Sequence, residues 1–135
     1  MFSFQTRITL AHTDAAGVVF FPRQLELAHT AFEDLMRHIG WALETMLTEG
    51  RWLLPVVRAE ADYRHPLRLG NELTIGIGLQ RLGDSSFTLA YTFTHGGHTT
   101  GTFTTTHTLL SAEDFRPRPL PADLRTALTE TLAEA

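Results

Sequence analysis

The chain has 135 residues, of which 43% are hydrophobic, 19% charged and 10% aromatic. This length and composition fit one globular domain over residues 1–135 and exclude the weakly hydrophobic, highly charged class of disordered chains. The net charge of −4 supplies no positive field for a phosphate backbone, so we expect no nucleic-acid partner.

The first predicted element is a strand over residues 2–10. Mostly apolar residues alternate there with polar residues, and this period of two is typical of a strand with one buried side. The face expected to be buried consists of Phe2, Phe4, Thr6, Ile8 and Leu10.

A long helix is predicted next, from Leu25 to Ile39. Apolar residues recur there at spacings of three and four and form one stripe. Pro22 suits the first turn of this helix, and Gly40 suits its end. Residues 41–49 predict a second, short helix.

The rest of the chain is predicted to consist mainly of strands. Residues 53–63 alternate and indicate one strand, in which Pro55 favours an edge position or a bulge. Residues 71–110 alternate in successive runs separated by short turns, which predicts an antiparallel meander. A Pro-rich stretch then leads to a last helix over residues 122–133.

This order of elements indicates an α+β fold. A curved antiparallel sheet of about five strands must bury its apolar face, and the long helix is the only element able to cover it, so we expect the sheet to wrap around the helix. The Thr-rich run from Thr99 to Thr106 is expected to form an open edge. An open edge of this kind predicts a homodimer that continues the sheet and pairs further into a tetramer.

Missing residue types exclude several kinds of chemistry. The chain contains no Cys and no Lys, which rules out thiolate nucleophiles, disulfides, thiolate zinc sites, Schiff-base lysines and P-loops. No apolar run approaches the roughly 18 residues that span a bilayer. We therefore expect no membrane contact and a cytoplasmic location.

The non-periodic segment between the first strand and the long helix is the best candidate for a site. Asp14 lies there among small and apolar residues, which are expected to desolvate its carboxylate, raise its pKa and favour a role as base or nucleophile. The helix beginning near Phe21 offers free backbone N–H groups and the positive end of its dipole to an oxyanion. The residues alone equally allow Asp14 to be a turn or capping carboxylate.

This segment also carries a resemblance to a known family. Residues 8–36 read ITLAHTDAAGVVFFPRQLELAHTAFEDLM, which resembles the signature of the 4-hydroxybenzoyl-CoA thioesterase family: an Asp, two small residues, Gly, three or four apolar or aromatic residues, then the helix. The resemblance continues through LLPVVRAEADYRHPLRLGNELTI at residues 53–75. Asp-x-Ala-Gly-Val-Val-Phe-Phe, Leu-Pro-Val-Val and Pro-Leu-Pro look closest to the branch that hydrolyses 1,4-dihydroxy-2-naphthoyl-CoA.

The resemblance implies a hotdog fold and an acyl-CoA thioesterase that converts an aromatic acyl-CoA, of the 1,4-dihydroxy-2-naphthoyl or 4-hydroxybenzoyl type, to the free acid and CoA. It implies Asp14 as nucleophile or general base, the backbone N–H near Phe21 as oxyanion donor, and Gly17 as part of the catalytic loop. It implies no metal and no cofactor, since CoA is part of the substrate and a thiolate leaves readily.

Other functions remain open at this point. A broad thioesterase for short or medium acyl chains and a non-catalytic acyl-CoA binding domain are the alternatives. A dehydratase of the same fold is disfavoured, because such enzymes resemble a His-Phe-Pro-Gly loop or an Asp-x-Asn-x-x-His helix, whereas Phe20 and Phe21 are followed here by Pro22 and Arg23.

Further side chains are candidates for substrate binding or acid–base chemistry. Candidates for the acyl pocket are Val19, Phe20, Trp41 and Trp52, candidates for the CoA phosphates are Arg58, Arg64 and Arg81, and His12 either tunes Asp14 or faces solvent. His29 and Glu33 lie four apart on the predicted helix, as an acid–base pair or as a solvated pair. His95 and His98 flank a Gly-Gly turn without the carboxylate or thiolate company that a metal site favours.

Overall fold

A computed structural model describes residues 1–132 of the chain. Its elements are β1 (Phe2–Arg7), the short 3-10 helix η1 (Leu10–His12), α1 (Phe21–His38), α2 (Leu43–Glu49), β2 (Trp52–Leu53), β3 (Val56–Tyr63), β4 (Glu72–Leu82), β5 (Ser86–His95), β6 (His98–Thr108), β7 (Leu110–Ser111) and α3 (Ala122–Thr131). Residue 133, at the end of the last predicted helix, lies outside the described residues. Within residues 1–132, no helix is both long and apolar enough to cross a membrane.

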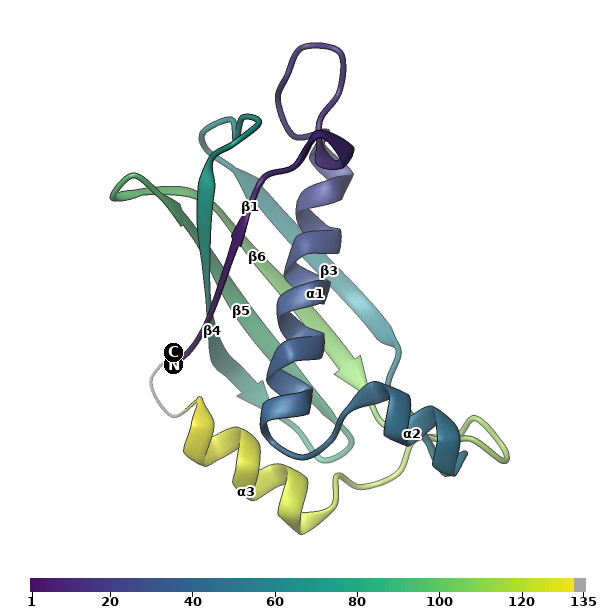
Figure 1. Cartoon of the computed structure of the whole chain (residues 1–135). Helices are drawn as coiled ribbons and strands as arrows, with labels where there is room; N and C mark the ends of the chain where they lie inside the picture. Colours follow the sequence, from purple (N-terminus) through teal and green to yellow (C-terminus); the bar gives the residue numbers. More distant parts are fainter. Residues whose placement is uncertain (133–135) are drawn as a thin grey trace.

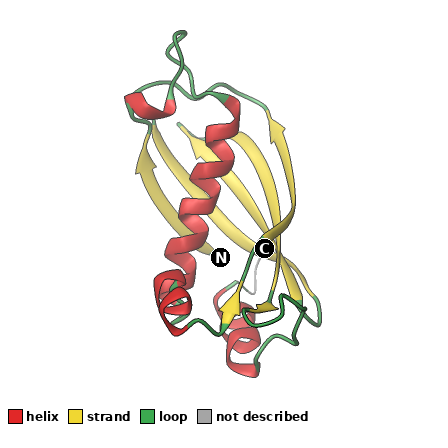
Figure 2. Ribbon diagram, turned by 90° about the vertical axis from the view of Figure 1, so that its right-hand side faces the viewer, coloured by secondary structure: helices red, strands yellow, loops and turns green. Residues whose placement is uncertain are grey.

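Five strands form one antiparallel sheet in the order β1-β4-β5-β6-β3, and β2 pairs with β7 in a separate ribbon. The sheet curves around α1, which lies along its concave face (Figures 1 and 2). The predicted α+β architecture is confirmed. The predicted open edge is wrong: the run from Thr99 to Thr106 belongs to β6, an inner strand, because β3 returns to pair with it.

The edge of the sheet beside β6 is β3. Its register shifts between Val56 and Arg58, so the prediction of an edge strand or bulge at Pro55 is confirmed. The predicted single strand over residues 53–63 is instead interrupted at Pro55, and Leu53 pairs with β7. All eight residues of β3 are exposed in the single chain, so the face that its alternation leads us to expect as buried is open here.

The first strand is shorter than predicted. It ends at Arg7, and Ile8 makes one further contact in the same register by donating its N–H to the Asn71 carbonyl at 2.9 Å. Ile8 is buried as expected, but Leu10 is 73% exposed because the chain has turned into η1 by that point. The expected burial of Leu10 is therefore wrong.

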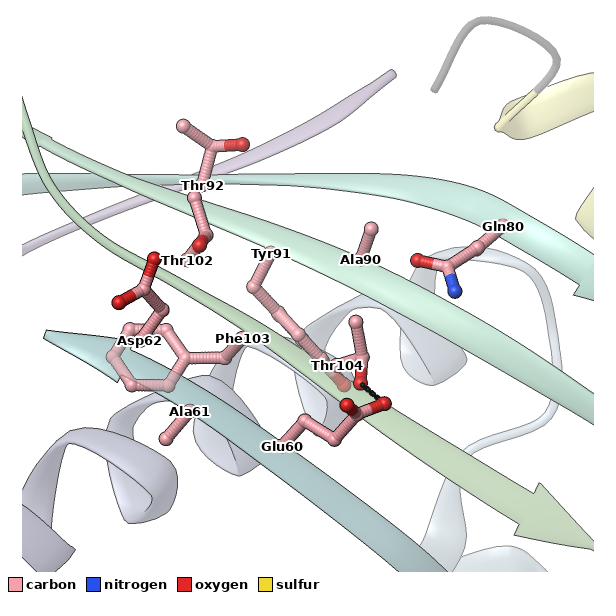
Figure 3. Close-up of a pocket in the computed structure, with 10 residues that line it drawn as sticks. All are labelled: Glu60, Ala61, Asp62, Gln80, Ala90, Tyr91, Thr92, Thr102, Phe103 and Thr104. Atoms are coloured by element: carbon pink, nitrogen blue, oxygen red, sulfur yellow. Dashed lines mark hydrogen bonds between the residues drawn. The ribbon is translucent and has the colours of Figure 1, made fainter.

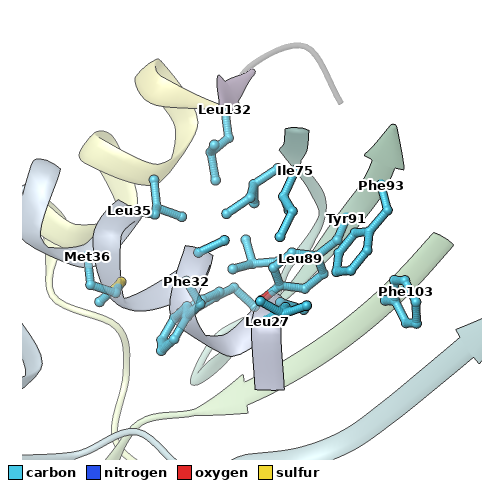
Figure 4. Close-up of a cluster of buried hydrophobic side chains, with 14 of the residues drawn as sticks. Leu27, Phe32, Leu35, Met36, Ile75, Leu89, Tyr91, Phe93, Phe103 and Leu132 are labelled. Atoms are coloured by element: carbon cyan, nitrogen blue, oxygen red, sulfur yellow. The ribbon is translucent and has the colours of Figure 1, made fainter. Parts of the chain in front are cut away.

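The helix α1 begins four residues earlier than the apolar stripe indicates. Phe20 is the residue before its first turn, Pro22 lies within that turn, and the chain leaves the helix at Gly40 with a positive φ of 86°. The predicted stripe is buried in its central part, against side chains from β4, β5 and β6 (Figure 4). The fully buried helix residues are Ala28, Ala31, Phe32, Leu35 and Met36.

One histidine lies inside this core. The ring of His107 stacks on Phe32 at 4.1 Å and on Phe87 at 5.3 Å between ring centres. Its Nε2 is 2.8 Å from the Thr105 hydroxyl, which is 2.7 Å from the Tyr91 hydroxyl. Burial, assisted by nearby His29, lowers the pKa of His107 to about 4, so the ring is neutral at pH 7.

This burial predicts an acid-sensitive fold. The folded-state pKa of about 4 is below the ordinary value of 6.5, so between these values the unfolded chain binds a proton that the folded chain does not. We expect the free energy of unfolding to fall as the pH is lowered from 6.5 to 4, by up to about 3 kcal/mol from His107 alone. Urea unfolding of the wild type and His107→Gln at pH 7 and pH 4.5 measures this; equal acid sensitivity in both proteins would contradict it.

Candidate active site

Asp14 lies in a tight turn between η1 and α1, the purple loop at the top of Figure 1. The Asp14 N–H donates to the Val18 carbonyl at 3.0 Å, and the Gly17 N–H donates to the Asp14 carbonyl at 3.0 Å. Gly17 has a φ of 77°, a left-handed conformation that glycine adopts at little cost. The Asp14 Oδ1 atom accepts the Ala16 N–H at 2.8 Å. Asp14 is thus a turn carboxylate through one oxygen, which leaves the other oxygen for chemistry.

The turn is fixed to the segment that follows β3. The Val19 N–H donates to the Leu67 carbonyl at 2.8 Å, and the Leu69 N–H donates to the Gly17 carbonyl at 3.2 Å. Val18 also forms an isolated β-bridge with Arg68. These contacts hold the Asp14 turn against one segment that is distant in sequence, residues 67–69 between β3 and β4.

The start of α1 offers one free backbone donor in its first three residues. Pro22 has no N–H, and the Arg23 N–H donates to the Phe20 carbonyl at 2.8 Å. The Phe21 N–H has no acceptor within residues 1–132, so it is the group placed to polarise a carbonyl. The Phe21 carbonyl accepts the Tyr63 hydroxyl at 2.8 Å, which fixes the helix start to β3.

The expected desolvation of Asp14 by its sequence neighbours is wrong for the single chain. Asp14, Ala15 and Ala16 are all exposed, because the turn projects beyond the end of the sheet (Figure 1). Val19, by contrast, is 7% exposed and belongs to the core, so it is not an open pocket wall. Any shielding of the carboxylate must come from a substrate or from another molecule.

The other residues close to the turn have distinct roles. The His12 Nδ1 atom accepts the Thr9 N–H at 3.0 Å, which caps η1 and orients this ring toward Thr9. Phe20 is 48% exposed and Phe21 62% exposed, with ring centres 5.4 Å apart. These two phenyl rings give the site an open apolar surface next to the free N–H.

Trp41 and Trp52 do not meet Asp14 in one chain. α1 has 18 residues and is therefore about 27 Å long, and Trp41 follows its far end, where its N–H donates to the Met36 carbonyl at 2.8 Å. Trp52 lies in β2, with the Arg51 guanidinium 4.7 Å from its ring centre. Within one chain, the length of α1 separates Trp41 from the turn. That Trp41 or Trp52 lines the acyl pocket, from its own chain or from a partner subunit, stays a prediction.

The candidate arginines are also dispersed. Arg58 and Arg64 lie within 3.5 Å and 3.4 Å of the carboxylates of Glu60 and Asp62. Arg81 pairs across β4 and β5 near their connecting turn, at the end of the sheet opposite Asp14. The chain therefore does not gather Arg58, Arg64 and Arg81 into one phosphate site.

Two hollows lie elsewhere on the sheet. One of about 440 Å³ is on the face opposite α1, where Thr104 donates to Glu60 at 3.4 Å, and it contains no predicted site residue (Figure 3). Another of about 340 Å³ is lined by His65, His95 and His98. No group of three or more His, Cys, Asp and Glu side chains in residues 1–132 is placed to hold a metal ion.

Tyr63 is the site residue that sequence reasoning missed. Its ring lies against Phe21 at 6.1 Å and Phe103 at 5.5 Å, and its hydroxyl holds the start of α1. The alternation of β3 places Tyr63 on the helix side, but only the strand order shows that β3 ends beside Phe21.

Comparisons with known proteins place this geometry in context. A model of the thioesterase-like superfamily matches residues 8–128. The 1,4-dihydroxy-2-naphthoyl-CoA hydrolase of Synechococcus elongatus is 34% identical over 125 residues, which is 92% of each chain, and that of Thermosynechococcus vestitus is 34% identical over 132 residues, 94% of this chain and 90% of the relative. The crystal structure of a 1,4-dihydroxy-2-naphthoyl-CoA thioesterase from Synechocystis superposes with a TM-score of 0.91 at 25% identity and covers 99% of this chain and 98% of its own.

Proposed function

The chain belongs to the thioesterase-like superfamily, whose members share the hotdog fold, and we propose on that premise that it hydrolyses an aromatic acyl-CoA, with 1,4-dihydroxy-2-naphthoyl-CoA as its preferred substrate. The observation that carries the chemistry is that the exposed Asp14 carboxylate and the free Phe21 N–H stand on either side of one short segment of chain, at the start of α1. The relatives' names support the choice of acyl group.

The proposed reaction uses this pair directly. The thioester carbonyl oxygen accepts the Phe21 N–H, which stabilises the negative charge that develops there. As a nucleophile, Asp14 forms an anhydride with the acyl group and releases CoA thiolate, and water then cleaves the anhydride; as a general base, Asp14 takes a proton from the water that attacks the carbonyl. A thiol of pKa about 8.5 leaves without a strong acid, so the proposal includes no metal and no cofactor.

The proposal includes a second copy of the chain. β3 is an open edge with exposed apolar side chains, among them Val56 at 39% and Val57 at 59%, and unpaired edges of this kind favour pairing with another chain. We infer a homodimer joined through β3, which brings the partner close to the exposed Phe21 and Tyr63. Assembly of such dimers into a tetramer and a cytoplasmic location stay predictions.

Thiol release from a panel of CoA esters tests the proposed function. The panel contains 1,4-dihydroxy-2-naphthoyl-CoA, 4-hydroxybenzoyl-CoA, phenylacetyl-CoA and straight-chain acyl-CoAs, with a chromogenic thiol reagent. We expect one aromatic ester to exceed the straight-chain esters about a hundredfold in kcat/KM, which is about 2.7 kcal/mol of transition-state discrimination. Slow release of equal rate across the panel would instead indicate a broad acyl-CoA thioesterase, and tight binding without release a non-catalytic domain.

A further inference from the structure

The side of β3 that faces α1 is uncovered. Residues directly opposite in an antiparallel pair share a face, and Ala59 and Ala61 pair with Thr105 and Phe103, which are both buried on the helix side of β6. Ala59 and Ala61 therefore also point to the helix side, yet both are exposed. We call the surface formed by Ala59 and Ala61 the alanine strip.

The residues of β3 on either side of the alanine strip show which part of α1 lies beside it. At one end, Tyr63 of β3 donates its hydroxyl to the Phe21 carbonyl at 2.8 Å, next to the free N–H. At the other end, Val56 of β3 pairs with His107, whose ring centre is 6.5 Å from that of His29 on α1. The alanine strip thus runs beside α1 from the candidate oxyanion donor toward His29.

His29 is held in a defined orientation. Its Nδ1 atom is 3.2 Å from the Glu33 carboxylate, and its ring lies 5.2 Å from that of Phe32. A carboxylate only accepts, so the bond is made by Nδ1–H, and in its neutral form the imidazole presents Nε2 as an acceptor. The His29 side chain is 41% exposed, which leaves it reachable by a ligand.

The spacing along α1 suits an aromatic acyl group. His29 is eight residues after Phe21, about 12 Å along the axis, and helical side chains lean back toward the N-terminus. In the proposed complex, a carbonyl bound at the Phe21 N–H directs the acyl group along α1 toward His29, beside the small, exposed side chains of Ala59 and Ala61. A ring hydroxyl remote from the thioester then meets the imidazole.

We propose that His29 is a specificity-determining residue that accepts a hydrogen bond from a ring hydroxyl of the acyl group, with Glu33 as the residue that positions its imidazole. This inference rests on the proposed function and deepens it, since it selects hydroxylated aromatic acyl groups over unsubstituted ones. It assigns a role to the His29–Glu33 pair that a solvated ion pair on a helix surface would not have.

The test compares two substrates that differ in one hydroxyl group. These are 1,4-dihydroxy-2-naphthoyl-CoA and 1-hydroxy-2-naphthoyl-CoA, which lacks the hydroxyl at position 4. We expect the wild type to favour the first by about tenfold or more in kcat/KM, as one well-placed hydrogen bond allows. His29→Leu is expected to lower kcat/KM for the dihydroxy ester to the level of the monohydroxy ester and to leave the latter within about twofold of the wild type.

The matched control is His38→Leu. His38 is on the same helix, but its ring lies 5.3 Å from that of Phe2 in β1, the edge strand opposite β3, so the substrate ratio should stay at the wild-type value. An equal loss on both esters in His29→Leu, or an unchanged ratio, would overturn the proposal. If the wild type releases thiol from neither ester, the proposed function fails. The role of His29 is then decided by calorimetry of the two free acids: the wild type should bind the dihydroxy acid more tightly than the monohydroxy acid by the same ratio, and His29→Leu should bind both equally.

Discussion

Asp14→Asn is expected to lower kcat for thioester hydrolysis by about a thousandfold, within the range found when a catalytic base or nucleophile is removed. The amide can neither attack the thioester nor take a proton from water. It still offers an oxygen to the Ala16 N–H, which Asp14 now binds at 2.8 Å, so the turn and the Phe21 N–H should keep their positions. Steady-state thiol release should therefore show a loss in kcat with KM nearly unchanged.

The control for this substitution is Asp34→Asn. Asp34 is an exposed carboxylate on α1, so the same chemical change there should leave kcat at the wild-type value. Thermal unfolding of both variants checks that each remains folded. If Asp14→Asn retains kcat within about threefold of the wild type, Asp14 is only the turn carboxylate that its Oδ1 contact describes.

Ala61→Pro is expected to dissociate the proposed dimer and to abolish most activity. The Arg64 N–H donates to the Thr100 carbonyl at 3.0 Å, and strand backbone groups alternate in direction, so the N–H of Ala61 points to the open edge rather than to β6. Proline removes that donor without breaking the β3–β6 ladder. A two-fold interface loses each contact twice, so we expect association to weaken at least about a hundredfold.

Sedimentation velocity over a range of protein concentrations measures this effect. Ala61→Ser is the control, since it keeps the backbone N–H and a small side chain and should remain dimeric. Circular dichroism shows whether the proline variant keeps its sheet. A folded Ala61→Pro protein that sediments with the wild type would exclude β3 as the interface.

Much of the fold could be predicted because local pattern reports which side of each element is buried. The stripe through Phe32 identified the long helix, and Pro55 identified the edge strand with its bulge. The stripe alone did not show that α1 begins at Phe21, since Phe21 and Pro22 lie outside it; the first-turn preference of Pro22 indicated that start. The run from Thr99 to Thr106 was predicted to be an edge strand because of its low charge, but inner strands also carry few charges. Only the pairing of β3 with β6 shows that this run is an inner strand.

The candidate site was predictable where it is continuous in sequence. Asp14 and Gly17 lie in one turn, and Phe21 follows as the first residue of α1, so their order along the chain already groups them. For Trp41 and Trp52, aromatic character says nothing about which end of a helix a residue occupies, so the sequence could not show that Trp41 lies at the end of α1 remote from Asp14. The environment of His107, between Phe32 and Phe87, depends on contacts between three separate elements.

The strand order has a consequence for how the molecule assembles. The inner strands β4, β5 and β6 are joined by short turns, whereas β1 pairs Phe2 with Ile77 and β3 pairs Val56 with His107 across long stretches of chain. The entropy lost in closing a loop grows with its length, so the two outer strands make the least local pairings in the sheet. These outer strands are also the ones that lead into the Asp14 turn and border α1. The end of the sheet that carries the candidate site is thus built from the contacts that cost most to close, which places local opening there rather than in the central meander.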